Sequence, residues 1–139
     1  MTPVSEHWCT DTLPPAAQFG AWRDVIVDAH LAWDIPGIRC ERFPAYMRQH
    51  RVGDLRVTDC TAAAPVRGTR GAAQIAADDA AYLNVVLVAG GRETLRFGPH
   101  EADTVTLQAG QFTLWDSTRP MAFATGEDLL VHCERDGLS

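Results

Sequence analysis

Residues 112–124 of the chain read FTLWDSTRPMAFA. At both ends of this stretch, large apolar side chains alternate with smaller or more polar ones, which is the pattern of half-buried β-strands. The five residues between the strands, 116–120, form a turn with a carboxylate and a guanidinium three positions apart. The stretch therefore predicts two strands joined by a charged corner, and it raises the question of what the charges do.

The corner is defined here by Asp116, Arg119 and Pro120. In the structural interpretation, the Asp116 carboxylate accepts backbone N–H groups of the turn, as aspartate does in Asx-turns, and Arg119 pairs with it or with carbonyl groups. Pro120 fixes φ and starts the next strand at a barrel edge. In the functional alternative, Arg119 clamps an anionic ligand. Turn chemistry explains all three residue types, so we expect the corner to be structural.

Most of the chain after residue 42 has the same strand pattern. Alternating segments at 43–52 and 55–62 flank Gly53-Asp54, a tight hairpin signal. Residues 82–89 are almost wholly apolar, as in a strand buried on both faces. Residues 65–80 are less regular and predict a short strand with an excursion. Further short strands are predicted at 92–97, 104–107, 112–115, 121–124 and 129–133. Such a series predicts a barrel or a sandwich.

A helix is expected before the strands, over residues 15–34. Apolar residues recur there at spacings of three and four and so share one face: Phe19, Trp22, Ile26, Ala29 and Trp33. The preceding residues, 1–14, lack periodicity and predict an extended arm. The whole chain is thus expected to form one domain, with its β region over residues 43–134.

Composition limits the classes of function. The 139 residues fit one domain with a core of useful size. An apolar content of 46% and a charged content of 22% argue against disorder. The net charge is −6, whereas phosphate binding needs clustered positive charge, so no nucleic-acid surface is expected. All twelve basic residues are arginine, which excludes a lysine base or Schiff base.

The sequence contains no apolar run long enough to span a membrane. Residues 1–18 also lack the basic and apolar regions of a signal peptide. We therefore expect a cytoplasmic protein without membrane contact. The cysteines are widely spaced and form no CxxC pair, so they predict free thiols and not a zinc site: Cys9, Cys40, Cys60 and Cys133.

Several familiar motifs are missing from the sequence. It has no GxGxxG, Walker, GxSxG or HExxH pattern. None of the five histidines lies within four residues of another. A metal-binding barrel of the cupin type usually has two histidines one residue apart on a strand. We therefore expect no metal and no other cofactor.

Strand alternation selects residues that could face a barrel interior. Asn84 is an isolated amide in an apolar strand, so it marks either a wet cavity or a core amide with satisfied hydrogen bonds. Trp115 either lines the cavity or packs under the helix. His132 is either structural or titrates inside a pocket. The predicted ligand-binding residues are Met47, His50, Tyr82, Asn84, Trp115 and His132.

From Phe19 to the C-terminus, the chain resembles the effector-binding domain that precedes the helix-turn-helix region in AraC/XylS-type transcription regulators. The likeness is carried by FGAWRDVI (19–26), VRGTRGAAQIAADDAAYLNVVLVAGG (66–91), VTLQAGQFTLWDSTRPMAF (105–123) and VHCERDGL (131–138). The Asp-x-x-Arg-Pro corner is the most specific element. The resemblance implies a mainly β fold, namely a cupin-like antiparallel β-barrel preceded by one packed α-helix. It also implies a small organic ligand and the pairing of two copies.

The chain departs from the family pattern in two places. The usual Pro-Gly-Asp turn is Ala109-Gly110-Gln111, in which only the glycine is kept, the part that a positive φ demands. The sequence also ends at Ser139, without the family's linker helix and DNA-reading helices, so we expect no direct binding of nucleic acid by this chain. Arg70 matches a family arginine and either forms an ion pair, with Asp78, Asp79 or Asp116, or supplies a cation to a pocket.

The favoured function is a small-molecule sensor domain of the AraC type without DNA-binding helices. The alternative is a stand-alone, metal-free enzyme of the cyclase or isomerase kind, built on the same fold and acting in a biosynthetic pathway. Such an enzyme would work by enclosing its substrate. Its acid–base groups would come from His50, His132, Asp59 or Tyr82. A third interpretation is a dimerisation or scaffold module without a ligand.

Overall fold

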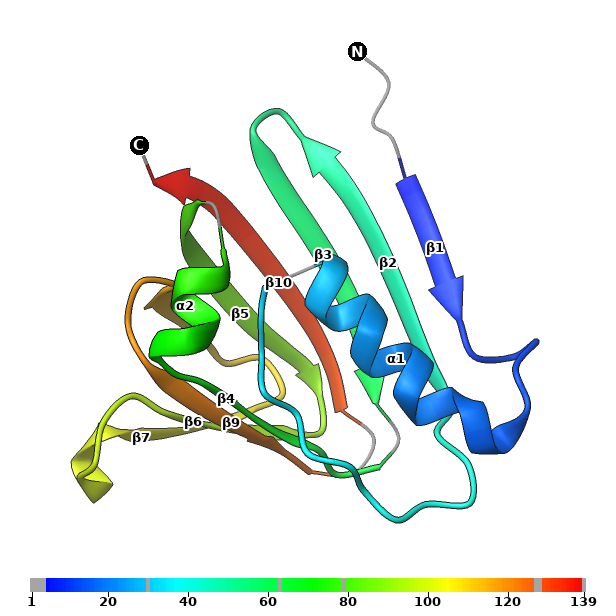
Figure 1. The fold of residues 1–139 in the computed structure, drawn as a ribbon. Coiled ribbons are helices and arrows are strands. Elements are labelled where there is room, and N and C mark those ends of the chain that lie inside the picture. The colour runs from blue at the N-terminus through cyan, green and yellow to red at the C-terminus, as the bar shows by residue number, and fades with distance from the viewer. Residues whose placement is uncertain (1–4, 30, 63, 79, 127–128, 139) are drawn as a thin grey trace.

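The computed structural model describes residues 5–29, 31–62, 64–78, 80–126 and 129–138, and the side chains within these ranges except those of residues 5, 29 and 129–138. The described strands form two antiparallel sheets (Figure 1). The larger sheet has the strand order β1 (Ser5–Cys9), β2 (Ala45–Val52), β3 (Leu55–Ala62), β10 (Leu129–Leu138), β5 (Ala81–Gly90) and β8 (Phe112–Asp116). The smaller sheet has the order β4 (Arg67–Arg70), β9 (Met121–Thr125), β6 (Arg92–Arg96) and β7 (Thr104–Gln108).

Tight turns join several strands that follow one another in the sequence. The β2–β3 hairpin pairs Val52 with Leu55 and turns at Gly53, whose φ is 61°. Gly110 precedes β8 with a φ of 88°. Both values lie in the left-handed region that glycine adopts without a steric penalty. The glycine kept in the Ala109-Gly110-Gln111 turn therefore has the conformation that its retention predicted.

The helix α1 (Pro15–Ala29) is shorter than the predicted 15–34. After it, Asp34 exchanges two backbone hydrogen bonds with Thr69 of β4, so this part of the chain is extended. Leu31 and Ile35 on either side of that bridge are buried in the core. Tertiary contacts with the smaller sheet thus override the helical periodicity that Trp33 had continued.

The predicted arm and the irregular segment also contain regular elements. Ser5–Cys9 is the edge strand β1, which pairs antiparallel with β2. Within 65–80 the chain forms β4 and then the short helix α2 (Ala72–Ala77). A 3-10 turn, η1 (Glu101–Asp103), precedes β7.

One face of the larger sheet carries the core. The helix α1 lies across β2 and β3, and the smaller sheet lies over the β10–β5 side (Figure 1). Two clusters of buried residues fill the layers, one around Val88, Leu95 and Trp115 and the other around Trp22, Phe43 and Met47. Burying each such side chain contributes about 1.5–3 kcal/mol relative to leaving it exposed.

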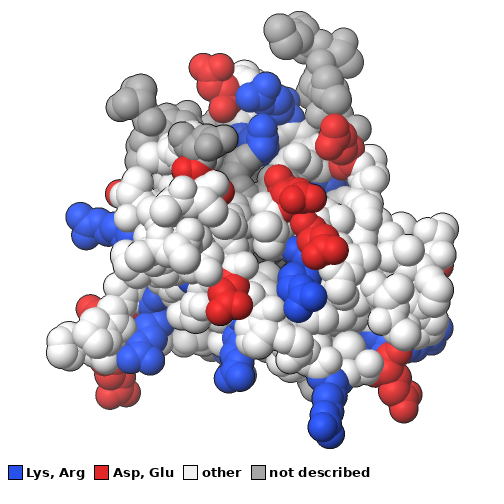
Figure 2. Space-filling model, in the orientation of Figure 1, with Lys and Arg blue, Asp and Glu red and all other residues white. Residues whose placement is uncertain are grey.

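The structure is mainly β with a packed helix, as the sequence predicted. Strand spacing left a barrel and a sandwich open. The described strands are distributed over two facing sheets, and no strand pairing between the sheets closes them into one continuous barrel. On the face shown in Figure 2, acidic and basic side chains are interspersed. In the described part of the chain, no helix is long and apolar enough to cross a membrane.

Candidate ligand-binding cavity

A cavity of about 80 Å³ lies where α1, the larger sheet and the smaller sheet meet. Residues from all three elements line it, together with Trp33 and Val66 from the connections. Its walls are formed by Trp22, Ile26, Trp33, Thr58, Cys60, Thr61, Ala62, Val66, Val86, Glu93, Leu95, Trp115, Met121, Phe123 and Thr125. The lining is mostly apolar with a few polar groups, which is the usual character of a small-molecule site.

Aromatic rings pack edge to face along one side of the cavity. The ring of Trp33 lies 5.7 Å from that of Trp115 and 5.0 Å from that of Phe123, at interplanar angles of 61° and 88°. Such T-shaped pairs stabilise their mutual arrangement beyond simple burial. Trp33 therefore lines the cavity from the extended segment after α1 and not from the helix.

Phe123 reaches its position because β4 has a glycine opposite it. Gly68 and Phe123 are direct partners in the β4–β9 register. A Cβ atom on Gly68 would lie 2.5 Å from Cε1 and 2.8 Å from Cζ of the Phe123 ring. Because real Cβ atoms do not approach this closely, any larger residue at position 68 would displace the ring.

Glu93 is the carboxylate in the cavity wall. In β6 the buried residues are Glu93 and Leu95, and they alternate with the less buried Arg92, Thr94 and Arg96. Glu93 is only 8% exposed, and its Oε2 atom is buried without a hydrogen-bond partner in the described structure. Burial raises the pKa of the Glu93 carboxyl to about 7. Near neutral pH the group can therefore hold or release a proton.

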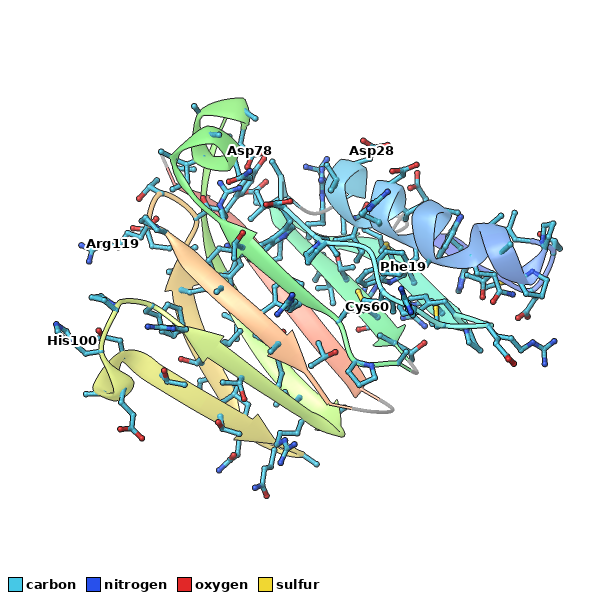
Figure 3. The ribbon with its side chains drawn as sticks, turned by 60° about the horizontal axis from the view of Figure 1, so that its bottom comes forward. Phe19, Asp28, Cys60, Asp78, His100 and Arg119 are labelled. Carbon is cyan, nitrogen blue, oxygen red and sulfur yellow. The ribbon has the colours of Figure 1, made fainter. Side chains whose placement is uncertain are left out.

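Cys60 faces the same cavity from β3 and, like Phe19 of α1, packs against the cluster of buried residues around Trp22, Phe43 and Met47 (Figure 3). Burial raises the pKa of the Cys60 thiol to about 12, and the negative charges of Glu93 and Asp59 add to that rise. A thiol of this kind stays protonated and is a poor nucleophile at neutral pH. Cys60 therefore contributes volume and a weak hydrogen-bond donor and not reactivity.

The hydroxyl groups of the cavity threonines already form hydrogen bonds within the protein. The Thr58 hydroxyl accepts from Nε2 of Gln49 at 3.2 Å, and the Thr61 hydroxyl accepts from the Tyr46 backbone N–H at 3.1 Å. The Thr125 hydroxyl accepts the Val66 N–H at 2.9 Å. By contrast, Nε1 of the buried Trp22 has no hydrogen-bond partner in the described structure. Glu93 and Trp22 are thus two cavity residues with a buried polar atom that no described residue satisfies.

Of the six predicted ligand-binding residues, Trp115 lines this cavity. Met47 is buried in the cluster beneath α1, and Tyr82 packs against the other cluster. Asn84 is fully buried opposite Trp115 in the β5–β8 register, and neither of its side-chain polar atoms has a hydrogen-bond partner in the described structure. Met47, Tyr82 and Asn84 are outside the cavity lining.

Three of the proposed acid–base groups, His50, Asp59 and Tyr82, do not line this cavity. His50 and Asp59 alternate with Met47 and Cys60 along β2 and β3, so they belong to the opposite face of the larger sheet. Asp59 lies 3.9 Å from Nε of Arg48 in a partly exposed ion pair. The backbone of His132 is paired with Asp59 and with Leu87, and its side chain lies outside the described residues.

The corner at 116–120 is held by its own hydrogen bonds. Oδ1 of Asp116 accepts from the Thr118 backbone N–H at 2.8 Å and from its hydroxyl at 2.7 Å, an Asx-turn. These bonds lower the pKa of the Asp116 carboxyl, and the Arg119 charge adds a smaller effect. Arg119 is exposed and extends away from the body of the protein (Figure 3). Pro120, also exposed, precedes β9.

Arg70 connects this corner to two other segments. Its side chain is 1% exposed, and its Nε donates to the Ser117 carbonyl at 3.0 Å. One terminal nitrogen donates to the Ala32 carbonyl at 2.9 Å and also pairs with the Asp78 carboxylate at the end of α2. The sequence left two roles open for Arg70, an ion pair or a pocket cation. The structure shows the ion pair, with Asp78.

Sequence reasoning missed Glu93 and Trp22 as cavity residues. A signal for Glu93 was present, because in RETLRF it shares a strand face with Leu95, and an acidic residue on an apolar face is unusual. Trp22 was placed correctly on the apolar face of the helix, but nothing local shows that its indole N–H has no partner. Among the described side chains, no group of three or more His, Cys, Asp or Glu residues could hold a metal ion.

The comparisons with known proteins agree with this architecture. The model of the AraC-binding-like domain family matches residues 22–135. Among solved structures, the AraC-like transcriptional activator CuxR superimposes with a TM-score of 0.74 at 20% identity, over 98% of this chain and 47% of that one. Ectoine synthase from P. lautus has a TM-score of 0.50 at 10% identity, over 66% of this chain and 63% of its own. At these identities the likeness concerns the fold, which is cupin-like, as the resemblance in sequence implied.

A curated relative is also similar in sequence. The uncharacterized protein in the nit 5′ region of Bacillus sp. (strain OxB-1) is 30% identical over 111 residues, which cover 80% of this chain and 42% of that protein. The chain thus spans a little under half the length of this relative and of CuxR.

Proposed function

Since the chain belongs to the AraC-binding-like domain family, we propose that it is a sensor domain that binds a small organic molecule in the cavity between α1 and the two sheets. The observation that carries the proposal is that Glu93 and Trp22, which line a mostly apolar cavity, each have a buried polar atom without a hydrogen-bond partner in the described structure. Buried polar groups are nearly always hydrogen-bonded, so such atoms indicate a site that a ligand completes.

The position of the cavity supports a regulatory role. A bound molecule would contact α1 through Trp22, the larger sheet through Trp115 and the smaller sheet through Phe123. It would therefore favour one arrangement of the three elements over others, which is how a ligand shifts a conformational equilibrium. Binding of nucleic acid would belong to another part of a longer regulator, and cytoplasmic location and pairing of two copies remain predictions.

Tryptophan fluorescence provides a direct test. Three of the four tryptophans in the sequence line the cavity. Titration with a metabolite panel should therefore change the emission and raise the melting temperature when a ligand binds. A panel that leaves both signals unchanged would contradict the proposal.

A cavity-filling variant locates the effect. Ala62→Leu places extra methyl groups in the lining, whereas Ala124→Leu makes the same change at an exposed position of β9. We expect the first variant to lose binding and the second to keep it, with both folded by circular dichroism. Equal binding by the two variants would place the ligand elsewhere.

A further inference from the structure

Among the described residues, the polar groups of the cavity divide into satisfied and unsatisfied sets. The threonine hydroxyls already take part in protein hydrogen bonds, and the Cys60 thiol is protonated. Oε2 of Glu93 and Nε1 of Trp22 lack partners. A fitting ligand therefore needs a group that hydrogen-bonds to Glu93.

The charge of that group follows from what surrounds Glu93. No arginine of the described residues lines the cavity, so these residues bring no counter-charge there. Burial raises the pKa of the carboxyl to about 7, so Glu93 can remain neutral while alone and ionise when a cation arrives. The rings of Trp33, Trp115 and Phe123 would also attract a cation through their faces.

We propose, on the basis of the function proposed above, that the ligand is a small apolar molecule carrying a protonated amine, whose ammonium group pairs with the Glu93 carboxylate inside the aromatic cavity. A volume of about 80 Å³ is smaller than the apolar cavity of about 150 Å³ that accommodates benzene. The apolar part of the ligand would therefore be compact. The net charge of −6 also favours the approach of cations.

Three probes with one carbon skeleton separate charge from shape: isobutylamine, isobutanol and isobutyrate. Binding of each to the full chain is followed by tryptophan fluorescence and by melting temperature. We expect the amine to bind at least ten-fold more tightly than the alcohol, and isobutyrate not to bind. In Glu93→Gln the amine should lose at least ten-fold in affinity while the alcohol is little affected.

The matched control is Glu101→Gln, which makes the same change at an exposed position in η1. It should bind the amine like the wild type. If the alcohol binds the wild type as tightly as the amine does, or if Glu93→Gln binds the amine unchanged, the inference fails while the cavity function stands. Failure of all three probes to bind also overturns the inference. The proposed function is then decided separately, by the metabolite panel with Ala62→Leu.

Discussion

Arg70 and Glu93 are two buried ionisable side chains in contrasting surroundings. Arg70 donates to two backbone carbonyls and pairs with Asp78. Glu93 lies in an apolar wall, and its Oε2 has no partner in the described structure. The comparison shows that burial alone does not indicate a binding site. Removing a buried charge that has protein partners destabilises the fold, whereas a buried ionisable group without partners is available for a ligand.

Removing Arg70 should have the largest effect on stability. Arg70→Met leaves the carbonyls of Ala32 and Ser117 without their donor and Asp78 without its cation. We expect the free energy of unfolding to fall by about 3–5 kcal/mol, measured by urea denaturation. The matched control is Arg67→Met, an exposed position on the same strand, which should change stability by about 0.5 kcal/mol or less. Similar losses in both variants would mean that the buried contacts of Arg70 contribute no more to stability than an exposed arginine on the same strand does.

Glu93 should affect stability in the opposite sense, with an effect that begins near pH 4.5 and grows as the pH rises to about 7. The pKa of its carboxyl is about 7 in the folded chain against an ordinary 4.5. The folded state therefore holds a proton that the unfolded state has lost between these values, and stability falls as pH rises through this window. The difference of about 2.5 units corresponds to a loss on the order of 3 kcal/mol by pH 8.

The Glu93→Gln variant tests this dependence, since its side chain cannot ionise. Relative to the wild type, it should gain stability progressively between pH 5 and 8, measured by urea denaturation at each pH. Glu101→Gln should follow the wild-type curve. A constant difference in stability between Glu93→Gln and the wild type at all pH values would mean that folding does not raise the pKa of the Glu93 carboxyl.

The smallest effect is expected at the corner itself. Asp116→Ala removes the two hydrogen bonds from Thr118 but leaves the buried contacts of Ser117 with Tyr82 and Arg70. We expect a loss of about 1 kcal/mol. Because the pKa of Asp116 is lowered on folding, its contribution is present above the ordinary pKa and is lost as pH falls through the folded value. A loss as large as that of Arg70→Met would mean that the partly buried Asp116 carboxylate contributes as much to stability as the buried Arg70 guanidinium.

Local patterns were sufficient for the strands and insufficient for the cavity. Alternation and turn residues located β2, β3 and β5 through β9 to within one or two residues, because each strand's pattern depends on its own side chains. The end of the helix was wrong because Trp33 continues a helical spacing while its ring packs against Trp115 and Phe123. That contact depends on a sheet formed later in the chain.

The site is less predictable from sequence than the fold. Trp22, Cys60, Glu93 and Trp115 are far apart in sequence and meet only where the helix and two sheets join. Alternation can show that Glu93 shares a face with Leu95, but not that the opposing wall lacks a positive charge. Similarly, the resemblance identified the corner as a family marker, whereas the connections of Arg70 explain what that corner holds in place.

The close packing of Phe123 on Gly68 has a consequence for how such a sensor could acquire new specificities. The ring forms part of the cavity wall, yet its position depends on the absence of a single carbon atom on the neighbouring strand. A mutation at position 68 could therefore resize the cavity without altering any residue that the ligand touches. Selection on ligand size can thus act through a residue that would never be identified by its contacts.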